Sequence, residues 1–215
     1  MLKQKNFLGA TIFLLLFILW TLAVSVIDVK TIGPLESAVG FATINKLVHN
    51  LTGVNFTFYN ITDWLGLVPL AVCFGFGVLG FMQLIKRKII FKVDYDILVL
   101  GVFYIIVIAV YLLFEVVVIN YRPVLINGVL EVSYPSSTTM LTLCVMPTAI
   151  MQFNKRIKNI TVKNAVVLIS VIFTVFMVVG RIFSGVHWIT DIIGGALFSA
   201  GIVMMYFSVI KIKLK

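Results

Sequence analysis

The sequence is poor in cysteine and in charged residues, and both shortages narrow the class of protein. It has two cysteines in 215 residues, Cys73 and Cys144, and each lies inside an apolar run. A disulfide framework is therefore not expected, and the two thiols are most simply small hydrophobic residues. Charged residues make up 12% of the chain and hydrophobic residues 61%, against roughly 45–50% in an average soluble domain. The composition indicates an integral membrane protein in which residues 1–215 form a single domain.

Acidic residues are also scarce: eight Asp and Glu accompany 17 Lys and Arg, which gives a formal net charge of +9. A basic balance of this size can mark a protein that binds nucleic acid. Here the Lys and Arg residues stand in short clusters between apolar runs, which is the pattern of a membrane protein. We therefore expect a membrane, and not a nucleic acid, as the partner of this chain.

Six apolar segments are candidates for membrane-spanning helices, so the expected fold class is an all-α integral membrane protein with six transmembrane helices. A span needs roughly 17–25 mostly apolar residues. The first run is longer than the roughly 7–15 residues of a signal-peptide core, so it is expected to remain as a helix. Four segments reach the length of a span unaided, and two reach it only with polar residues at one end. The four are 7–27, 64–85, 97–114 and 192–210, and the two are 138–153 and 165–180.

The distribution of basic residues orients the six expected helices. When the segments alternate across the membrane, 13 of the 17 Lys and Arg residues fall on one side. By the positive-inside rule this side is cytoplasmic, so both termini are expected there. Five polar residues then lie together on the outer side, namely Arg122, Ser136, Arg181, His187 and Asp191.

The most informative stretch of the chain is GRIFSGVHWITDIIGG, residues 180–195. His187 and Asp191 are four positions apart, and on a helix such residues share one face. Asp191 is then expected to accept a hydrogen bond from one ring nitrogen of His187, which leaves the other nitrogen free as a nucleophile or base. Arg181 adds a planar donor that suits a phosphate. The plainer alternative is that His187 and Asp191 only cap or pair at the start of a helix.

Two further segments supply polar groups on the same side. The segment EVVVINYRPV ends a helix with Arg122, and YPSSTTML opens a helix with Ser136 and Ser137. Backbone N–H groups at such a helix start can bind an anion. Taken alone, the serines are cap residues, Arg122 is an anchor that reaches toward water, and His49 in the long outer loop is a surface histidine. Taken together, the groups suggest a phosphate cradle around a nucleophile.

On these motifs the chain resembles the type 2 phosphatidic acid phosphatase / haloperoxidase superfamily, in its six-helix membrane branch. That family carries Lys-x6-Arg-Pro, then Pro-Ser-Gly-His, then Ser-Arg-x5-His-x3-Asp. The order and spacing agree, and seven of the eleven motif positions match. In this sequence the three motifs read Glu115-x6-Arg122-Pro123, Pro135-Ser136-Ser137-Thr138 and Gly180-Arg181-x5-His187-x3-Asp191.

The resemblance implies a role for each matching residue. His187 is the implied nucleophile that takes the phosphoryl group, and Asp191 is the partner that orients it. The resemblance implies no metal and no cofactor. The implied substrate is a lipid phosphate or pyrophosphate, met at the outer face of a bacterial plasma membrane. The implied phosphate ligands are Arg122, Arg181, Ser136 and Ser137.

Four motif positions depart from the family pattern, and two of them, Thr138 and Glu115, matter most; Ser137 for Gly and Gly180 for Ser are milder changes. The family's second-motif histidine protonates the leaving group, and here that position is Thr138, whose hydroxyl is too weak an acid near neutral pH. The first-motif lysine is Glu115, which would repel phosphate unless it pairs with Arg122 or Arg181 or points away. Loss of the acid favours a leaving group that needs no proton. We therefore expect a preference for a pyrophosphate such as a polyprenyl diphosphate.

Other functions stay open at this point. Glu115 and Thr138 favour a catalytically impaired pseudo-phosphatase that binds lipid phosphate or serves as a partner in an envelope assembly. A small channel or transporter has less support, because outside the site no charged residue lies in the middle of a span. The sequence also leaves open whether His49 or Tyr134 replaces the missing acid, which lipid is used, and the oligomeric state.

Overall fold

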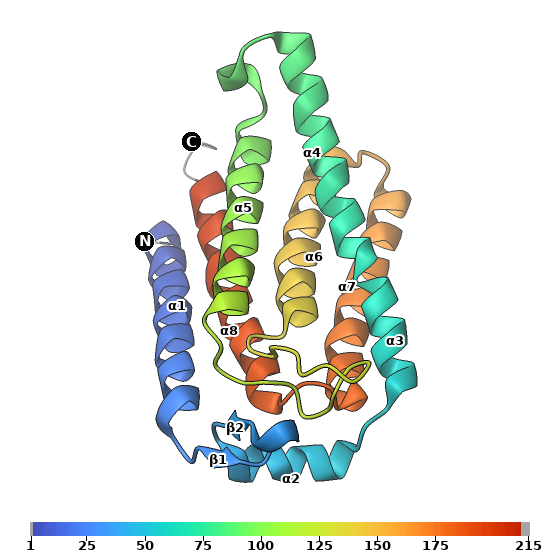
Figure 1. Cartoon of the computed structure of the whole chain (residues 1–215). Coiled ribbons are helices and arrows are strands. Elements are labelled where there is room, and N and C mark those ends of the chain that lie inside the picture. Colours follow the sequence, from blue (N-terminus) through green and yellow to red (C-terminus); the bar gives the residue numbers. More distant parts are fainter. Residues whose placement is uncertain (1, 212–215) are drawn as a thin grey trace.

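A computed structural model of the chain describes residues 2–211, and it is built almost entirely of helices (Figure 1). Two very short strands pair antiparallel after the first helix. In chain order the elements are α1 (Leu2–Val26), β1 (Lys30–Thr31), the 3-10 turn η1 (Pro34–Glu36), β2 (Ala38–Val39), α2 (Ala42–Thr52), α3 (Phe56–Leu65), α4 (Leu67–Arg87), the 3-10 turn η2 (Ile90–Lys92), α5 (Tyr95–Val116), α6 (Ser137–Arg156), α7 (Ile160–Ser184) and α8 (Ile189–Ile210).

The expected all-helical membrane fold is confirmed in outline. Each of the six expected segments corresponds to one long helix, namely α1, α4, α5, α6, α7 and α8. Within residues 2–211, five helical segments are long and apolar enough to cross a membrane, and α3 continues into α4 to form one of them (Phe56–Arg87). Helix α6, which covers the expected segment 138–153, is not among these five.

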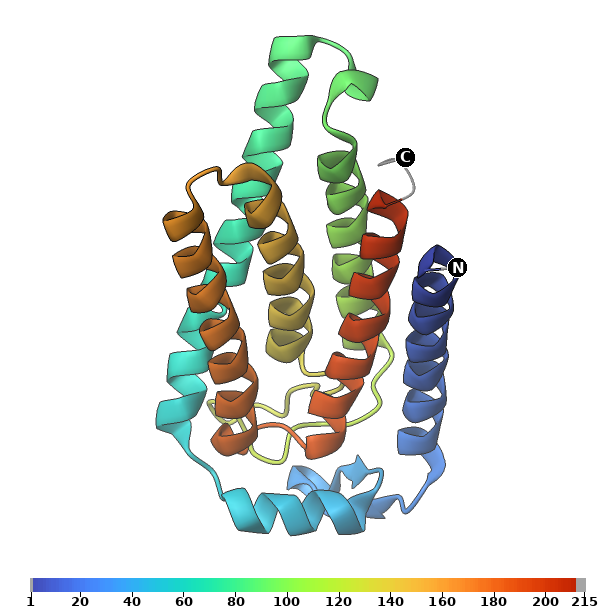
Figure 2. The ribbon, with the colours of Figure 1, turned by 180° about the vertical axis from the view of Figure 1, so that it is seen from behind.

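Helix α6 is less apolar than the other long helices, and several of its polar side chains face neighbouring helices. It packs against α7 and α8 and also contacts α4 and α5 (Figures 1 and 2). The hydroxyl of Thr148 lies 3.2 Å from that of Tyr104 on α5, and the amide of Gln152 donates to the hydroxyl of Tyr206 on α8. Polar groups removed from water need such partners. Helix α6 is therefore the polar centre of an apolar bundle.

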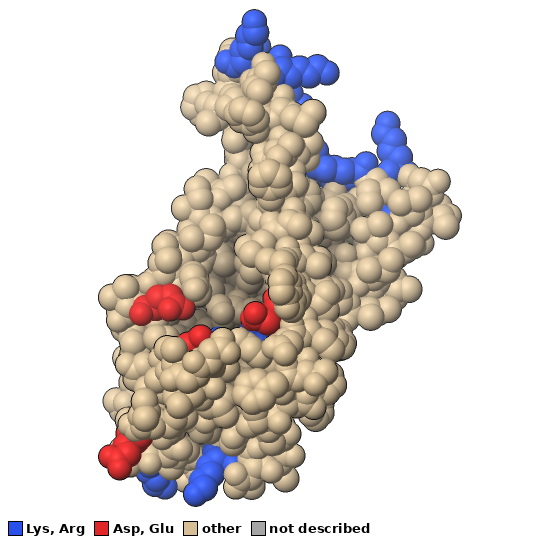
Figure 3. Space-filling model, turned by 45° about the vertical axis from the view of Figure 1, so that its right-hand side comes forward, with Lys and Arg blue, Asp and Glu red and all other residues tan. Residues whose placement is uncertain are grey.

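The connections between the long helices divide between two ends of the bundle. The start of α1 and the end of α8 lie toward one end, together with the α4–α5 connection and the α6–α7 connection, and Figure 3 shows Lys and Arg side chains gathered there. The other end holds α2, the strands, the α5–α6 loop and the short α7–α8 connection (Figure 2). All the polar motifs singled out in the sequence approach this second end.

Helix α2 lies across the second end of the bundle and contacts α8 (Figure 2). Asn45 on α2 is fully buried, and its amide donates to the carbonyl of Gly40 and to the hydroxyl of Thr190. Gly40 leaves no room for a side chain, because a Cβ there would lie 1.6 Å from the carbonyl oxygen of Val24. The α1–α2 connection is therefore held against both α1 and α8.

The end of α7 is set by a close contact with the α2–α3 connection. Gly185 follows α7 in the left-handed conformation, with a φ of +62°. A Cβ at this position would lie 1.8 Å from the carbonyl oxygen of Gly53. The backbone N–H of Asn55 also donates to the carbonyl of Ser184. Backbone packing therefore directs the turn into residues 186–188.

Replacing Gly185 with alanine should lower the free energy of unfolding by more than about 1 kcal/mol, because positive φ disfavours an L side chain and the new Cβ would clash with Gly53. Gly75→Ala is the matched control, since Gly75 lies inside α4 and, beyond its own stretch of helix, no atom of the described residues comes within 4 Å of its Cβ position. Alanine there should be neutral or stabilising. Thermal unfolding in detergent measures both variants, and equal melting temperatures would contradict the role of Gly185.

Candidate active site

The loop between α5 and α6, residues 117–136, folds back over the second end of the bundle (Figure 2). Two isolated antiparallel bridges close the loop on itself. This course carries Arg122 and Ser133 to the turn between α7 and α8, where both contact the ring of His187. The loop therefore supplies one half of a polar site and the α7–α8 turn supplies the other.

His187 lies in the turn before α8 and not on the helix. Helix α8 begins at Ile189, with Trp188 as its N-cap residue, so only Asp191 belongs to its first turn. The prediction of a direct hydrogen bond between the two residues is wrong, because His187 Nδ1 and Asp191 Oδ2 are 4.0 Å apart. The spacing rule for residues four apart holds only when both residues are helical.

The hydroxyl of Ser133 fills the gap between ring and carboxylate. Ser133 Oγ donates to Asp191 Oδ2 at 2.5 Å and lies 2.9 Å from His187 Nδ1. The proton of the hydroxyl points to the carboxylate, so a lone pair of the oxygen faces the ring nitrogen. The sequence carries no signal for Ser133, because the residue belongs to none of the motifs and lies in a loop whose course depends on packing.

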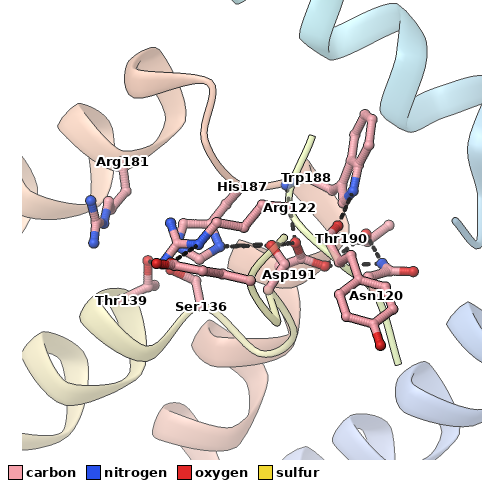
Figure 4. A network of polar contacts seen from close by, with 12 residues as sticks. Asn120, Arg122, Ser136, Thr139, Arg181, His187, Trp188, Thr190 and Asp191 are labelled. Carbon is pink, nitrogen blue, oxygen red and sulfur yellow. Dashed lines mark hydrogen bonds and ion pairs between the residues drawn. The ribbon is translucent and has the colours of Figure 1, made fainter. Parts of the chain in front are cut away.

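Asp191 is fully buried and is held by other donors as well as by Ser133. The amide of Asn120 donates to Oδ1 at 3.0 Å, and the backbone N–H of Trp188 donates to Oδ2 at 3.0 Å (Figure 4). The bond from Trp188 caps the start of α8, so the capping alternative for Asp191 also holds in the geometry. One carboxylate therefore both caps a helix and anchors the polar network.

Arg122 stands at the other nitrogen of the imidazole. Its Nη1 is 3.4 Å from His187 Nε2, and its Nε is 2.9 Å from the carboxylate of Glu131. A guanidinium can only donate, so Nε2 offers it a lone pair. This contact and the contact with Ser133 agree on one tautomer, with the proton on Nδ1 and the lone pair on Nε2.

Arg181 lies beside Arg122, and its side chain is 1% exposed. Its guanidinium donates to the hydroxyl of Thr138 and, at 3.3 Å, to the carboxylate of Asp63. The ring of Tyr59 lies 5.2 Å from the guanidinium carbon of Arg181 and 5.9 Å from that of Arg122, within reach of a cation–π contact. The two arginines therefore meet at one aromatic ring, and each already pairs with a carboxylate.

A cavity of about 480 Å³ opens beside the imidazole. Three of the expected site residues line it, namely Arg122, Ser137 and His187. Glu115 and Glu131 line it too, and Figure 3 shows a hollow flanked by acidic side chains. The ion pair of Arg122 is with Glu131. The carboxylate of Glu115 thus borders the cavity without forming an ion pair in the described part of the chain.

A second cavity of about 430 Å³ adjoins the first. The two cavities share Tyr111, Ser137 and Met140 as lining residues, and the second also borders Thr138 and Asp63. The rest of its lining is largely aliphatic and comes from α4, α5 and α6. An apolar space that meets a polar one suits a ligand with a hydrocarbon tail and a charged head.

Of the two serines at the start of α6, Ser137 borders the cavity and Ser136 does not. Ser136 is the N-cap residue and is fully buried, with its hydroxyl 3.1 Å from that of Thr139. Its backbone N–H donates to the carbonyl of Asp191 at 3.0 Å. Ser136 therefore joins α6 to α8, while Ser137 stands where a ligand can reach it.

His49 and Tyr134 do not occupy the position of the missing acid. The hydroxyl of Tyr134 lies 2.6 Å from that of Thr21 on α1. The ring of His49 packs against that of Trp188, with 5.5 Å between the ring centres. The position of Thr138 is instead reached by the guanidinium of Arg181.

His187 is uncharged at neutral pH. Burial lowers the pKa of its imidazole well below the usual value, and the positive charges of Arg122 and then of Arg181 lower it further. A neutral ring with an unprotonated Nε2 is the form that can attack an electrophile. The site therefore holds a neutral imidazole whose Nε2 lies 3.4 Å from the guanidinium of Arg122.

These features define a class of protein: a helical membrane bundle with a buried histidine–arginine site at one end. The PAP2 superfamily model matches residues 119–214, which include Arg122, the serine pair of α6 and the whole third motif. We therefore assign this part of the chain to the type 2 phosphatidic acid phosphatase (PAP2) superfamily, as the three motifs predict.

The fold agrees with this assignment. A transmembrane PAP2 type phosphatidylglycerolphosphate phosphatase from Bacillus subtilis has a similar structure, with a TM-score of 0.58 and 16% sequence identity. The similarity covers 95% of this chain and 97% of that chain. At this identity the likeness shows the fold alone. No curated protein sequence matches the chain.

The lowered pKa of His187 leads to a titration experiment. The chain contains two histidines, so His49→Gln leaves one imidazole to follow by ¹⁵N NMR in detergent. We expect this ring to stay neutral to a pH well below 6.5, with Nδ1 protonated and Nε2 bare. Adding Arg122→Gln removes a positive charge, so the ring should then gain its proton at a higher pH. A midpoint near 6.5 without Arg122→Gln would contradict the burial and charge assigned to the site.

Proposed function

We propose that the protein is a membrane lipid phosphatase that works through a phospho-histidine intermediate on His187. The observation that carries the proposal is the position of His187 Nε2. This atom bears a lone pair, belongs to a residue that lines a cavity of about 480 Å³, and lies 3.4 Å from the guanidinium of Arg122. A nucleophile beside a phosphate-binding group is the minimum that phosphoryl transfer requires.

Phosphate binding falls to the two arginines and to the start of α6. Arg122 and Arg181 exchange their carboxylate partners, Glu131 and Asp63, for oxygens of the substrate phosphate. Planar guanidinium groups match phosphate well and stabilise the charge that builds on its equatorial oxygens. Ser137 adds backbone and hydroxyl donors at a helix N-terminus, where the helix dipole favours an anion.

The reaction consists of two displacements at phosphorus. The Nε2 lone pair of His187 attacks phosphorus in line with the leaving oxygen, whose bond breaks with its electron pair. Water then attacks the phosphohistidine, the P–N bond breaks, and its electron pair returns to Nε2. Inorganic phosphate is released, and the water proton leaves with it or passes to solvent. The negative charge of Asp191 stabilises the ring while phosphorus is attached.

We infer that six helices cross a bacterial plasma membrane, with α6 as the sixth, and that residues 1–215 act as one domain. The contacts of α6 with four other helices support this, because its polar side chains need not face lipid. The basic residues near the termini favour a cytoplasmic position for that end. The site then opens on the outer face, where the aliphatic cavity beside Ser137 accommodates the substrate's hydrocarbon chain.

Thr138 favours a substrate whose leaving group departs without being protonated. Its hydroxyl contacts Arg181 and is no acid near neutral pH. In a phosphomonoester such as phosphatidate, the leaving group is an alkoxide, which needs a proton. In a lipid pyrophosphate, the leaving group is a lipid phosphate, whose second pKa is about 6, so it departs readily at neutral pH. We therefore propose a preference for a polyprenyl diphosphate.

A second candidate function is binding without turnover, as a pseudo-phosphatase or as a partner in an envelope assembly. The ion pairs of Arg122 with Glu131 and of Arg181 with Asp63 favour it, because substrate must displace both carboxylates. Glu115 adds a further negative charge beside the cavity. The oriented, neutral imidazole favours catalysis, since binding alone has no need of a nucleophile.

His187→Ala should reduce phosphate release from lipid substrates by at least about 10³-fold, because it removes the attacking atom. His49→Ala is the matched control, since it removes the other histidine and should keep most of the activity. Phosphate release in mixed micelles measures both. A parent protein that releases no phosphate would favour the binding function, and a His187→Ala variant that releases as much as an active parent would refute the phospho-histidine mechanism.

A polyprenyl diphosphate should release phosphate faster than phosphatidate or phosphatidylglycerophosphate in the same micelles. Thr138→His supplies a proton donor and should speed the two monoesters by about 10²–10⁴-fold, the usual worth of a general acid, and the diphosphate much less. Thr138→Ser is the control for a change of side chain without a new acid. Faster hydrolysis of phosphatidate by the parent protein would refute the preference.

A further inference from the structure

We propose that Ser133 is a positioning residue of this site: its hydroxyl, set between His187 Nδ1 and Asp191 Oδ2, selects the tautomer in which Nε2 is the nucleophile. The inference rests on the proposed phosphatase function and adds to it a residue that lies outside all three motifs.

The ring of His187 and the carboxylate of Asp191 are too far apart for a direct hydrogen bond, and the hydroxyl of Ser133 connects them. His187 Nδ1 and Asp191 Oδ2 are 4.0 Å apart, which exceeds a hydrogen bond by about 1 Å. Asp191 cannot move closer at little cost, because Oδ2 accepts the N–H of Trp188 and Oδ1 accepts the amide of Asn120. A shift would uncap α8 and leave a buried amide without its acceptor.

Ser133 is held in place by the same residue that holds the carboxylate. Its backbone N–H donates to the carbonyl of Asn120 at 2.9 Å, and the side chain of Asn120 donates to Asp191 at 3.0 Å. Together with the bond from Ser133 Oγ to Asp191, these contacts form a closed ring of three residues. Ser133 is 3% exposed, so water does not compete freely for its hydroxyl.

The hydroxyl has one proton, and its direction is determined by the ionised carboxylate. Because Asp191 can only accept, the proton of Ser133 goes to Oδ2 at 2.5 Å. Ser133 Oγ can then only accept from His187 Nδ1, 2.9 Å away, so Nδ1 carries the ring proton. Nε2 keeps its lone pair on the side of Arg122 and the cavity.

The same arrangement explains how the carboxylate acts on the ring during the reaction. When Nε2 bonds to phosphorus, the ring becomes more positive and Nδ1–H becomes a stronger donor. The bond to Ser133 Oγ strengthens, and the bond from Ser133 to Asp191 strengthens with it, because successive hydrogen bonds polarise each other. No proton moves in this step. Ser133 therefore conveys the charge of Asp191 to a ring that Asp191 does not touch.

Ser133→Ala should lower kcat for phosphate release by about 10- to 100-fold, the usual effect of removing an orienting group, and change KM by less than about twofold. Ser133→Thr keeps the hydroxyl and should restore most of the rate. Ser133→Cys keeps the size but weakens the donor, and it serves as the loss variant if the alanine protein does not fold. Ser37→Ala is the matched control, because Ser37 is also buried but its hydroxyl has no hydrogen-bond partner among residues 2–211.

A double-mutant cycle with Asp191→Ala tests whether Ser133 acts through the carboxylate. If it does, Ser133→Ala costs 10- to 100-fold in the parent and less than about twofold once Asp191 is gone, because the two changes break one chain of contacts. Effects that multiply across the cycle, or a parent-like kcat for both Ser133→Ala and Ser133→Cys, would overturn the proposal.

A spectroscopic readout keeps this test separate from the proposed phosphatase activity. In the His49→Gln background, the ¹⁵N spectrum should show His187 protonated at Nδ1, and Ser133→Ala should give a mixture of tautomers or the Nε2-protonated form. Ser133→Thr should keep the parent spectrum. An unchanged tautomer in both Ser133→Ala and Ser133→Cys would contradict the inference even if phosphate release is found. The expected change of tautomer would support the positioning role even if no lipid is hydrolysed.

Discussion

A carboxylate buried in the first turn of α8 must be surrounded by hydrogen-bond donors, and much of the site is arranged around that requirement. Asp191 has no exposed surface, and a charge removed from water is stable only when donors replace the water. The donors come from its own helix start, through Trp188, and from the α5–α6 loop, through Asn120 and Ser133. The need to satisfy one charge therefore ties a long loop to the bundle and carries Arg122, two residues after Asn120, to the imidazole.

The buried positive charges of the site also need partners of opposite charge. Arg181 and Arg122 are both buried, and their charges are compensated by Asp63 and Glu131 and by the ring of Tyr59. Such pairs keep two like charges close together without a ligand. Under the proposed function, a substrate phosphate must offer each guanidinium at least as good a partner as the carboxylate it replaces.

The bundle separates what lipid can solvate from what it cannot. The outer helices α1, α4, α5 and α7 expose many aliphatic side chains, whereas α6 turns several polar side chains toward its neighbours. Burial of polar groups between helices is tolerated where each finds a partner, as Thr148 and Gln152 do. Helix α6 begins at Ser137 beside the cavity, so a helix with a largely buried polar face also presents its N-terminus to the site.

Local composition was sufficient to locate the six long helices, because hydropathy and length are properties of short segments. It also placed Arg122, Arg181, His187 and Asp191 at one end of the bundle, since spans that alternate bring every second connection to the same side. It could not reveal Ser133 or the 4.0 Å separation of His187 from Asp191. Those depend on where α8 starts and how the loop of residues 117–136 folds, and contacts between segments far apart in the chain determine both.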